Sequence, residues 1–421
     1  MNLVCLLLVA TAQLGVTTAY EWLRTEALQE VLRRFSELDK SRKGGLDVRS
    51  TAPFVSADAF REALRPRVCL TGDMCQMDHT LHTSPGDAIY VDAECLSSFV
   101  RNVAPKLEHS FVLVVHNGPQ EVSSSSTGTG ALSLSDAETP GTGTLVFPDA
   151  LTQPLLRKMY VEGRLLAYHG HSLSWEGYER GLLRPAYMHC IPRGIDSRTS
   201  PQGDTPQKYV LALKELLMKR GHAKQVSQEK PLLLLNGALL HESSGVPHVD
   251  RTHTQLHALF ASNEFGFNHT ELHTVEAWLA AVAGHRFTAV PSARGRDSHR
   301  IMDVLLMGGV PVLRRNPAAS CYDNSDNQAN LTTIRGSLPV VIVDNWKQVT
   351  NQFLHNEWTR ISAVPAKRWD VGRLWVDHWL SRAASINQVF SQDIFPPITS
   401  RLPAHMYLHN EPVRGLNGRG W

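Results

Sequence analysis

Two arginines and a glycine separate an expected strand from an expected helix in the stretch FTAVPSARGRDSHRIMDVLLMGGVPVL, residues 287–313. Arg294 and Arg296 bracket Gly295 just before the helix begins. The N–H groups at a helix N-terminus, the positive end of the helix dipole and two guanidinium groups would then converge on one point. Such a point suits a pyrophosphate.

The elements around this turn predict a βαβ unit. The apolar, β-branched run 287–290 indicates a short strand, and Asp297 or Ser298 can cap the amphipathic helix that follows. The pair Gly308-Gly309 ends the helix, and a second apolar strand starts at Val310. Strand, tight loop, helix and strand in this order form the usual frame for a phosphate-bearing ligand.

The same stretch resembles a segment of exostosin-type glycosyltransferases. In that family the segment reads Pro-x-Gly-x-Gly-x-Asp-x-x-Arg, followed by an acidic residue, a glycine and Pro-Val before a strand. The matching positions here are Pro291, Gly295, Asp297, Arg300, Asp303, Gly308 and Pro311. The resemblance implies transfer of a sugar, with inversion, from a nucleotide-sugar donor (UDP-linked by expectation) to a glycan or glycoprotein acceptor.

Further segments resemble the family in the same order along the chain, so that the likeness spans residues 85–385. These segments are Ile89-Tyr90-Val91, Phe111 to Asn117, Ile191-Pro192-Arg193-Gly194-Ile195 and Leu338 to Trp346. The resemblance implies an α/β fold of two Rossmann-like domains facing a cleft, the GT-B arrangement.

Glycosyl transfer requires a neutralised leaving diphosphate, a deprotonated acceptor hydroxyl and exclusion of water. We expect the diphosphate to contact Arg294, Arg296, Arg300 and the amides around Ser298. The resemblance implies that Asp303 grips the donor, although it could instead pair with a neighbouring arginine. No cofactor or metal is required, because GT-B enzymes generally neutralise phosphate with basic side chains and helix dipoles.

The acceptor side is expected to supply the base. His116 ends a presumed parallel strand, at the edge where open α/β sheets collect ligands, and is the catalytic candidate; a capped structural histidine is the other interpretation. His169 and His171 end another strand and rank below it. Arg193 either approaches the donor phosphates or stabilises its own turn.

Length and charge limit the function classes. The chain has 421 residues, enough for two domains with independent cores. Its net charge of +2 and its 19% of charged residues lack the signature of a protein that binds polyanions. We therefore expect no nucleic-acid partner.

The N-terminus predicts a secretory protein. Residues 1–19 combine an apolar run with small residues before Tyr20, as in a cleaved signal peptide. An uncleaved anchor, the one expected route to a membrane, stays open because no Lys or Arg precedes the run. Glycosylation sequons at Asn268 and Asn330 fit the Golgi or ER lumen, or secretion.

Five cysteines remain after signal removal, which is too few for a disulfide scaffold. Cys69 and Cys75 are close enough in sequence for a small looped disulfide. The odd total implies at least one free or intermolecular thiol.

Alternating apolar strands and helices imply parallel sheets covered by helices. We expect an N-terminal acceptor-side α/β domain over 20–225, a C-terminal nucleotide-sugar-binding α/β domain over 226–390 and a tail over 391–421. A Ser/Thr/Gly-rich tract, 122–144, cannot bury enough apolar area to order itself. Expected strands include 87–91, 110–115, 164–168, 187–191, 231–235 and 338–343, and expected helices include 94–103, 272–283 and 370–390.

Two rival functions stay open. The first is a non-catalytic relative that binds a glycan or a partner, suggested by Ala293 and Asp303, where the family has Gly and Glu, and by the lack of an acidic residue after Asn117. The second is a secreted metal-dependent hydrolase, suggested by histidines at helical i, i+4 spacing, of which His269 and His273 are one pair.

Overall fold

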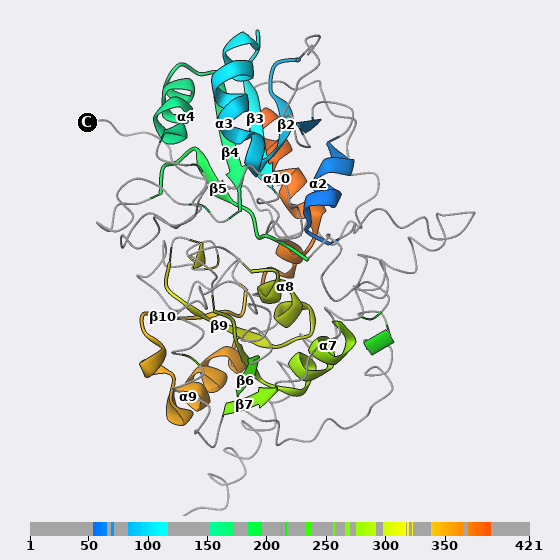
Figure 1. Cartoon of the computed structure of the whole chain (residues 1–421), viewed down its shortest axis with the longest axis vertical. Coiled ribbons are helices and arrows are strands. Elements are labelled where there is room, and N and C mark those ends of the chain that lie inside the picture. The colour runs from blue at the N-terminus through cyan, green and yellow to red at the C-terminus, as the bar shows by residue number, and fades with distance from the viewer. Residues whose placement is uncertain are drawn as a thin grey trace, which may run out of the picture.

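A computed structural model describes residues 54–64, 69–70, 83–116, 148, 151–171, 173, 184–195, 212, 215–216, 233–236, 256, 266–269, 275–291, 298–316, 318–319, 322, 338–364 and 369–388. These residues form two five-stranded parallel sheets, one above the other in Figure 1. The expected signal peptide, the tract 122–144 and the tail 391–421 lie outside the described residues.

The first sheet has the strand order β1-β2-β3-β4-β5, and every neighbouring pair is parallel. Its strands are β1 (Cys69–Leu70), β2 (Asp87–Asp92), β3 (Phe111–His116), β4 (Leu165–Gly170) and β5 (Met188–Cys190). Ile89 and Val91 of β2 pack into the core on one face, while Ala88 and Tyr90 pack into a second core on the other. This two-sided burial explains the continuous apolar runs from which four of the strands were expected.

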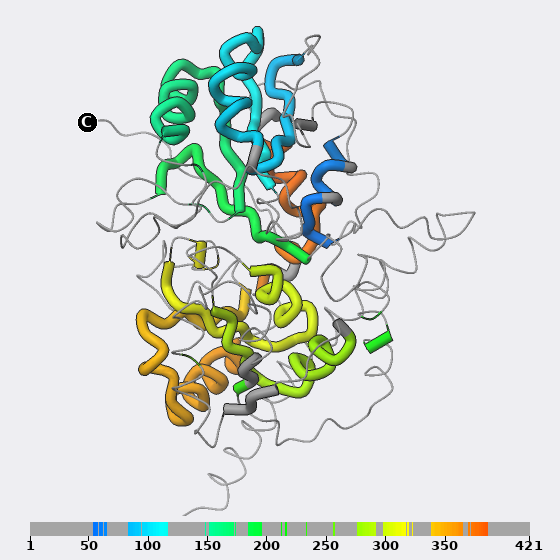
Figure 2. The backbone as a smooth tube through the Cα atoms, in the orientation of Figure 1, coloured from blue at the N-terminus to red at the C-terminus, as the bar shows by residue number. Residues whose placement is uncertain are grey.

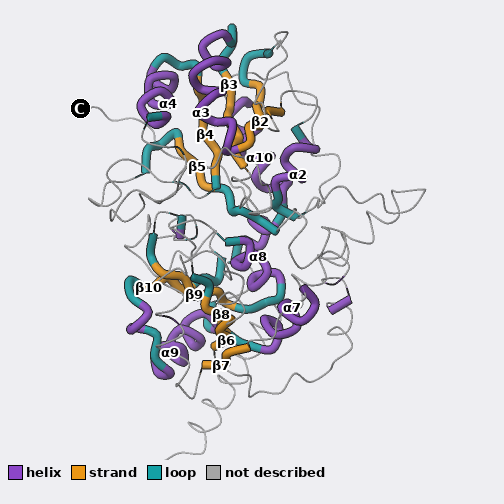
Figure 3. The backbone as a smooth tube through the Cα atoms, in the orientation of Figure 1, coloured by secondary structure: helices purple, strands orange, loops and turns teal. Residues whose placement is uncertain are grey.

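Helical segments cover one face of the first sheet. They are η1 (Ala93–Cys95), α3 (Leu96–Ser98), η2 (Phe99–Val103), η3 (Ala104–Lys106) and α4 (Thr152–Val161). The helix expected over 94–103 is helical but irregular, passing through 3-10, α and π turns before Pro105. Figure 3 shows these helices against the strands.

The second sheet has the strand order β10-β9-β8-β6-β7, again wholly parallel. Its strands are β6 (Leu233–Asn236), β7 (Gly266–His269), β8 (Phe287–Ala289), β9 (Val310–Arg314) and β10 (Val341–Val343). The strand expected over 338–343 starts only at Val341, since Pro339 has no N–H to donate. Strand β7 has no counterpart in the sequence-based expectation.

Both faces of the second sheet are also covered. Helices α7 (Val275–Gly284) and α8 (His299–Leu306) pack on one side. The 3-10 turn η10 (Trp346–Gln348) and helix α9 (Asn351–Ser362) pack on the other. The βαβ unit expected from the sequence, β8-α8-β9, is therefore present.

The C-terminal helix returns to the first sheet. The segment expected as one helix over 370–390 is η12 (Val371–Leu374) followed by α10 (Val376–Gln388). Helix α10 contacts β2, β3, β4 and α2 (Ala57–Ala63), and Figure 2 shows it beside the N-terminal segments. Its buried stripe of Val376, Trp379, Leu380 and Ala383 follows helical periodicity. Part of the range 226–390 thus packs with the first sheet, a placement that sequence order does not reveal.

One hydrophobic core joins the two sheets. It contains Tyr90 and Val114 of the first sheet together with Met302 of α8 and Trp379 of α10. Within this core, Phe54 forms an antiparallel bridge with Trp375. Among the described residues, no helix is long and apolar enough to cross a membrane.

Two cysteines of the first sheet's core, Cys95 and Cys190, each take part in a disulfide. The Arg184 Nη1 donates to the Cys190 sulfur at 3.0 Å. The loop disulfide expected between Cys69 and Cys75 cannot be traced, because Cys75 lies outside the described residues.

Candidate functional site

The second sheet has a topological switch point between β6 and β8. The chain passes from β6 to β7 on one side and then to β8 on the other, which gives the doubly wound order 2-1-3-4-5. In such sheets, ligands bind outside the carboxyl ends of the strands where the connections diverge. The loop between β8 and α8 leaves the sheet at this point.

Helix α8 begins as the sequence predicts. Ser298 is its N-cap, and the Ser298 Oγ accepts a hydrogen bond from the Arg300 backbone N–H at 3.3 Å. This confirms one of the two expected caps. Residues Arg294, Gly295, Arg296 and Asp297 lie outside the described part of the chain, so their phosphate-binding role stays a prediction. The residues that flank this gap are described: Pro291 is buried just after β8, and Ser298 caps α8.

Arg300 and Asp303 meet on Trp278 of helix α7. The Arg300 guanidinium carbon lies 5.1 Å from the centroid of the Trp278 ring. The Trp278 Nε1–H donates to Asp303 Oδ2 at 2.7 Å, and Asp303 is only 5% exposed. The Asp303 carboxylate is therefore held inside the helix pair, whereas Arg300 is only partly buried.

The carboxyl ends of the two sheets meet at the segment 192–194. Gly194 follows β5, and its carbonyl oxygen accepts from the Nδ1–H of His299, the first residue of α8, at 2.9 Å. Gly194 has a φ of +76°, and an added Cβ would collide with the backbone of Val55. Only glycine can make this close passage, so the 192–194 segment is fixed against both halves.

His116 ends β3 and faces the same segment. Its Nε2–H donates to the carbonyl oxygen of Pro192 at 3.2 Å, and its ring centroid lies 4.8 Å from that of His171. Burial lowers the pKa of His116 to about 3, and the charges of Arg193 and Arg61 lower it further against the opposing effect of the Pro192 carbonyl. His116 is therefore neutral at pH 7, and a base of such low pKa attracts a proton only weakly.

A partly buried ion pair lies near His116. Arg61 Nη2 is 3.2 Å from Asp92 Oδ1, and the Tyr90 hydroxyl donates to the same oxygen at 2.9 Å. Asp92 and His116 are register partners at the ends of β2 and β3. The carboxyl edge of the first sheet thus carries the His116 imidazole and the Asp92 carboxylate, whose charge is balanced by Arg61.

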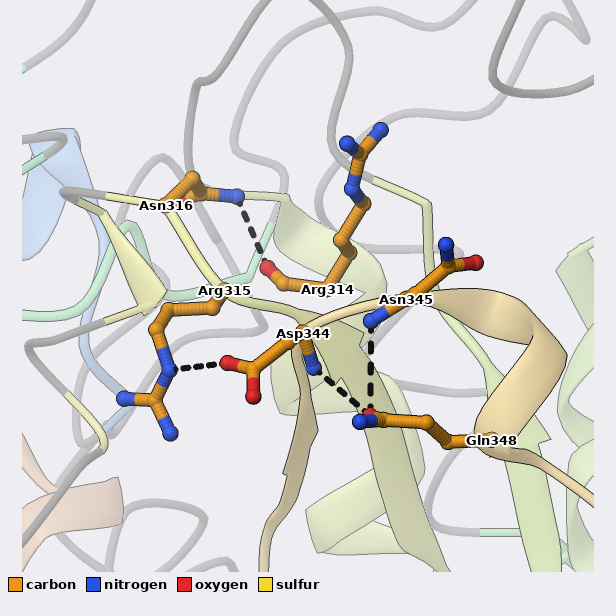
Figure 4. Close-up of polar contacts among 6 residues, drawn as sticks. All are labelled: Arg314, Arg315, Asn316, Asp344, Asn345 and Gln348. Carbon is orange, nitrogen blue, oxygen red and sulfur yellow. Dashed lines mark hydrogen bonds and ion pairs between the residues drawn. The ribbon is translucent and has the colours of Figure 1, made fainter.

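Two further arginines lie at the carboxyl end of β9 (Figure 4). The Arg315 Nε donates to Asp344 Oδ1 at 2.7 Å, which links the ends of β9 and β10. Asn345 and Gln348 form a capping box that fixes the turn after β10. Arg314 is exposed, and its side chain is drawn pointing away from this network.

Sequence reasoning missed three residues of this region, namely Trp278, His299 and Arg314. Trp278 belongs to a helix for which the sequence suggests only burial. His299 is the N1 residue of α8, and that position was the available signal. Arg314 is the last residue of β9 and directly follows its apolar residues, which is the position of a residue at the carboxyl edge of a parallel sheet.

No metal site is found within the described ranges, where no group of three or more His, Cys, Asp or Glu side chains could hold an ion. His269 ends strand β7, so the helical spacing proposed for His269 and His273 is wrong. A zinc-binding pair on one helix face does not form there.

Comparison with solved structures finds several chains that resemble this one in fold. No family model matches the chain, and no curated protein matches it. One of the similar solved structures is Anabaena HepE in complex with UDP-glucose. It shares 12% sequence identity with this chain, and the match covers 73% of this chain and 79% of HepE with a TM-score of 0.33.

Proposed function

We propose that the protein is a glycosyltransferase of GT-B arrangement that binds a nucleotide-sugar donor at the switch point of its second sheet. One observation carries the proposal: the hydrogen bond between His299 and Gly194 brings the carboxyl edges of two parallel sheets together at the start of α8. A donor diphosphate at that point would meet the helix N-terminus, Arg300 and the loop that holds Arg294 and Arg296.

The acceptor then binds against the first sheet. His116 ends β3, His171 directly follows β4, and Arg193 lies in the 192–194 segment beside them. A glycan or glycoprotein hydroxyl placed there would lie opposite the donor. We further propose an inverting transfer, for which NMR of the product anomer is the test.

The secretory location is supported by two observations. The sequence carries sequons at Asn268 and Asn330, and Cys95 and Cys190 take part in disulfides, which persist mainly in oxidising compartments. Protein secreted from eukaryotic cells should migrate faster on a gel after enzymatic removal of N-glycans.

A thermal-shift screen against UDP, GDP, CMP and their common sugar conjugates tests the donor proposal. A ligand that binds only the native state raises the apparent Tm, by an amount that grows with its concentration over Kd. A shift with one nucleotide identifies the donor class. If none of the nucleotides shifts the Tm of folded, glycosylated protein, the donor proposal is wrong.

A second candidate function is a non-catalytic binder of the same fold. It is favoured by the internal hydrogen bond of Asp303 and by the low pKa of His116, which leave both side chains poorly suited to catalysis. A nucleotide that binds but whose sugar is neither transferred nor hydrolysed would favour this candidate.

A further inference from the structure

A group of imidazole and guanidinium side chains lies on the face of the first sheet that α10 covers. His169 of β4 and His189 of β5 are register partners, with stacked rings whose centroids are 4.8 Å apart. Their neighbours Tyr168 and Met188 pack into the core on the α4 side. Because side chains alternate along a strand, both imidazoles point toward α10.

Trp379 of α10 gathers the other members of this group. The guanidinium carbons of Arg373 and Arg382 lie 5.6 and 5.9 Å from its ring centroid, and the His378 ring lies 5.0 Å away. The Trp379 Nε1–H donates to the Arg373 carbonyl oxygen at 2.9 Å, which fixes η12 against α10. We call His169, His189, Arg373, His378 and Arg382 the Trp379 cluster.

Several polar atoms of the Trp379 cluster are buried without a hydrogen-bond partner. They are both ring nitrogens of His169, which is 2% exposed, the Arg373 Nε and the His378 Nε2. Each such atom costs about 1–3 kcal/mol, so folded proteins seldom leave several side by side. Asp370 brings a carboxylate to the cluster, with its Oδ1 4.0 Å from His378 Nδ1.

The charges of the cluster favour an anion. Burial, with a contribution from Arg382, lowers the pKa of His169 to about 3 and that of His189 to about 4. Burial also lowers the pKa of His378 to about 4, with Asp370 opposing and Arg382 and Arg373 reinforcing the change. The imidazoles are thus neutral at pH 7, and the two arginines carry the positive charge.

We propose that the Trp379 cluster binds a small oxyanion, namely the phosphate, sulfate or carboxylate group of a ligand. The two guanidinium groups supply the positive charge, and the neutral imidazole N–H groups of β4 and β5 donate hydrogen bonds to the anion. The Arg382 side chain is exposed and that of His189 is partly exposed, so one side of the cluster reaches solvent. The site belongs to η12, α10 and the first sheet, so it does not depend on nucleotide binding at α8.

Calorimetric titration of the full-length protein with sodium sulfate, against sodium chloride at equal ionic strength, tests the proposal. We expect saturable sulfate binding that weakens at least tenfold in Arg382→Gln. The matched control is Arg101→Gln, which removes the same charge from an exposed arginine of the first half and should bind as wild type does. Arg382→Gln should fold, since the side chain is exposed, and far-UV circular dichroism checks this.

Absence of saturable sulfate binding, or equal affinity in wild type and Arg382→Gln, would overturn the proposal. Competition then identifies the natural source of the anion. Displacement of sulfate by glucuronate indicates an acidic sugar, displacement by UDP indicates a nucleotide, and displacement by neither indicates an inorganic ion. A nucleotide that binds without displacing sulfate would support the donor site and the Trp379 cluster separately.

Discussion

Replacement of Arg300 by alanine should weaken nucleotide binding far more than it weakens the fold. In the folded protein the Arg300 guanidinium contacts the Trp278 ring at 5.1 Å, a cation–π contact worth about 0.5–1 kcal/mol at a partly exposed site. A charge-assisted hydrogen bond to a phosphate contributes about 1.5–3 kcal/mol. The Kd for the nucleotide should therefore rise about 10- to 150-fold, while Tm falls by only a few degrees.

The chain offers a matched control for this substitution. Arg286 contacts Trp358 at the same distance of 5.1 Å, but it precedes β8 at the amino edge of the sheet. Arg286→Ala should cost similar stability and leave nucleotide affinity unchanged. Both variants are measured by isothermal titration with the nucleotide found in the thermal-shift screen. Wild-type affinity in folded Arg300→Ala, or equal losses in both variants, would refute the assignment of the donor site to α8.

Three other substitutions test the packing around the site. Gly194→Ala should destabilise the protein more than Gly163→Ala in thermal unfolding. Both glycines have a positive φ, which costs about 1–2 kcal/mol for alanine, but only at Gly194 would the new Cβ collide with backbone atoms. Equal losses of stability would contradict the close passage at 192–194. Arg61→Ala removes a partly exposed guanidinium from the buried Asp92 carboxylate, which keeps its Tyr90 hydrogen bond, and should cost about 1–3 kcal/mol in urea unfolding; a loss below about 0.5 kcal/mol would contradict this. The pKa of His116 in the folded protein is about 3, below its ordinary value of 6.5, so the unfolded chain binds the proton first and stability is lost as pH falls from 6.5 to 3. His116→Gln keeps an N–H donor and should flatten the profile of stability against pH in this range. An unchanged profile would contradict the lowered pKa.

Local features of the fold could be read from the sequence. The apolar runs at 87–91 and 110–115 are strands because they are buried on both faces, and Ser298 caps α8 because its oxygen satisfies an N–H of the first turn. Strand β7 gave no signal, since GFNH lacks the apolar run of its neighbours.

The contacts between distant parts of the chain could not be read in this way. Asp303 has the spacing of a donor-binding residue, but its carboxylate accepts a hydrogen bond from Trp278, 25 residues earlier. Helix α10 shows an amphipathic pattern that gives its buried face but not the sheet on which it packs. The meeting of His299 with Gly194 joins residues 105 positions apart and depends on the assembled fold.

Hydrogen exchange of the full-length protein, with and without a saturating nucleotide, tests the site of donor binding most directly. We expect slower exchange in the peptides that span β8, the following loop and the first turn of α8, residues 287–303, and little change in α9. Slower exchange confined to the first sheet, or no change anywhere despite measured binding, would contradict a nucleotide site at the start of α8.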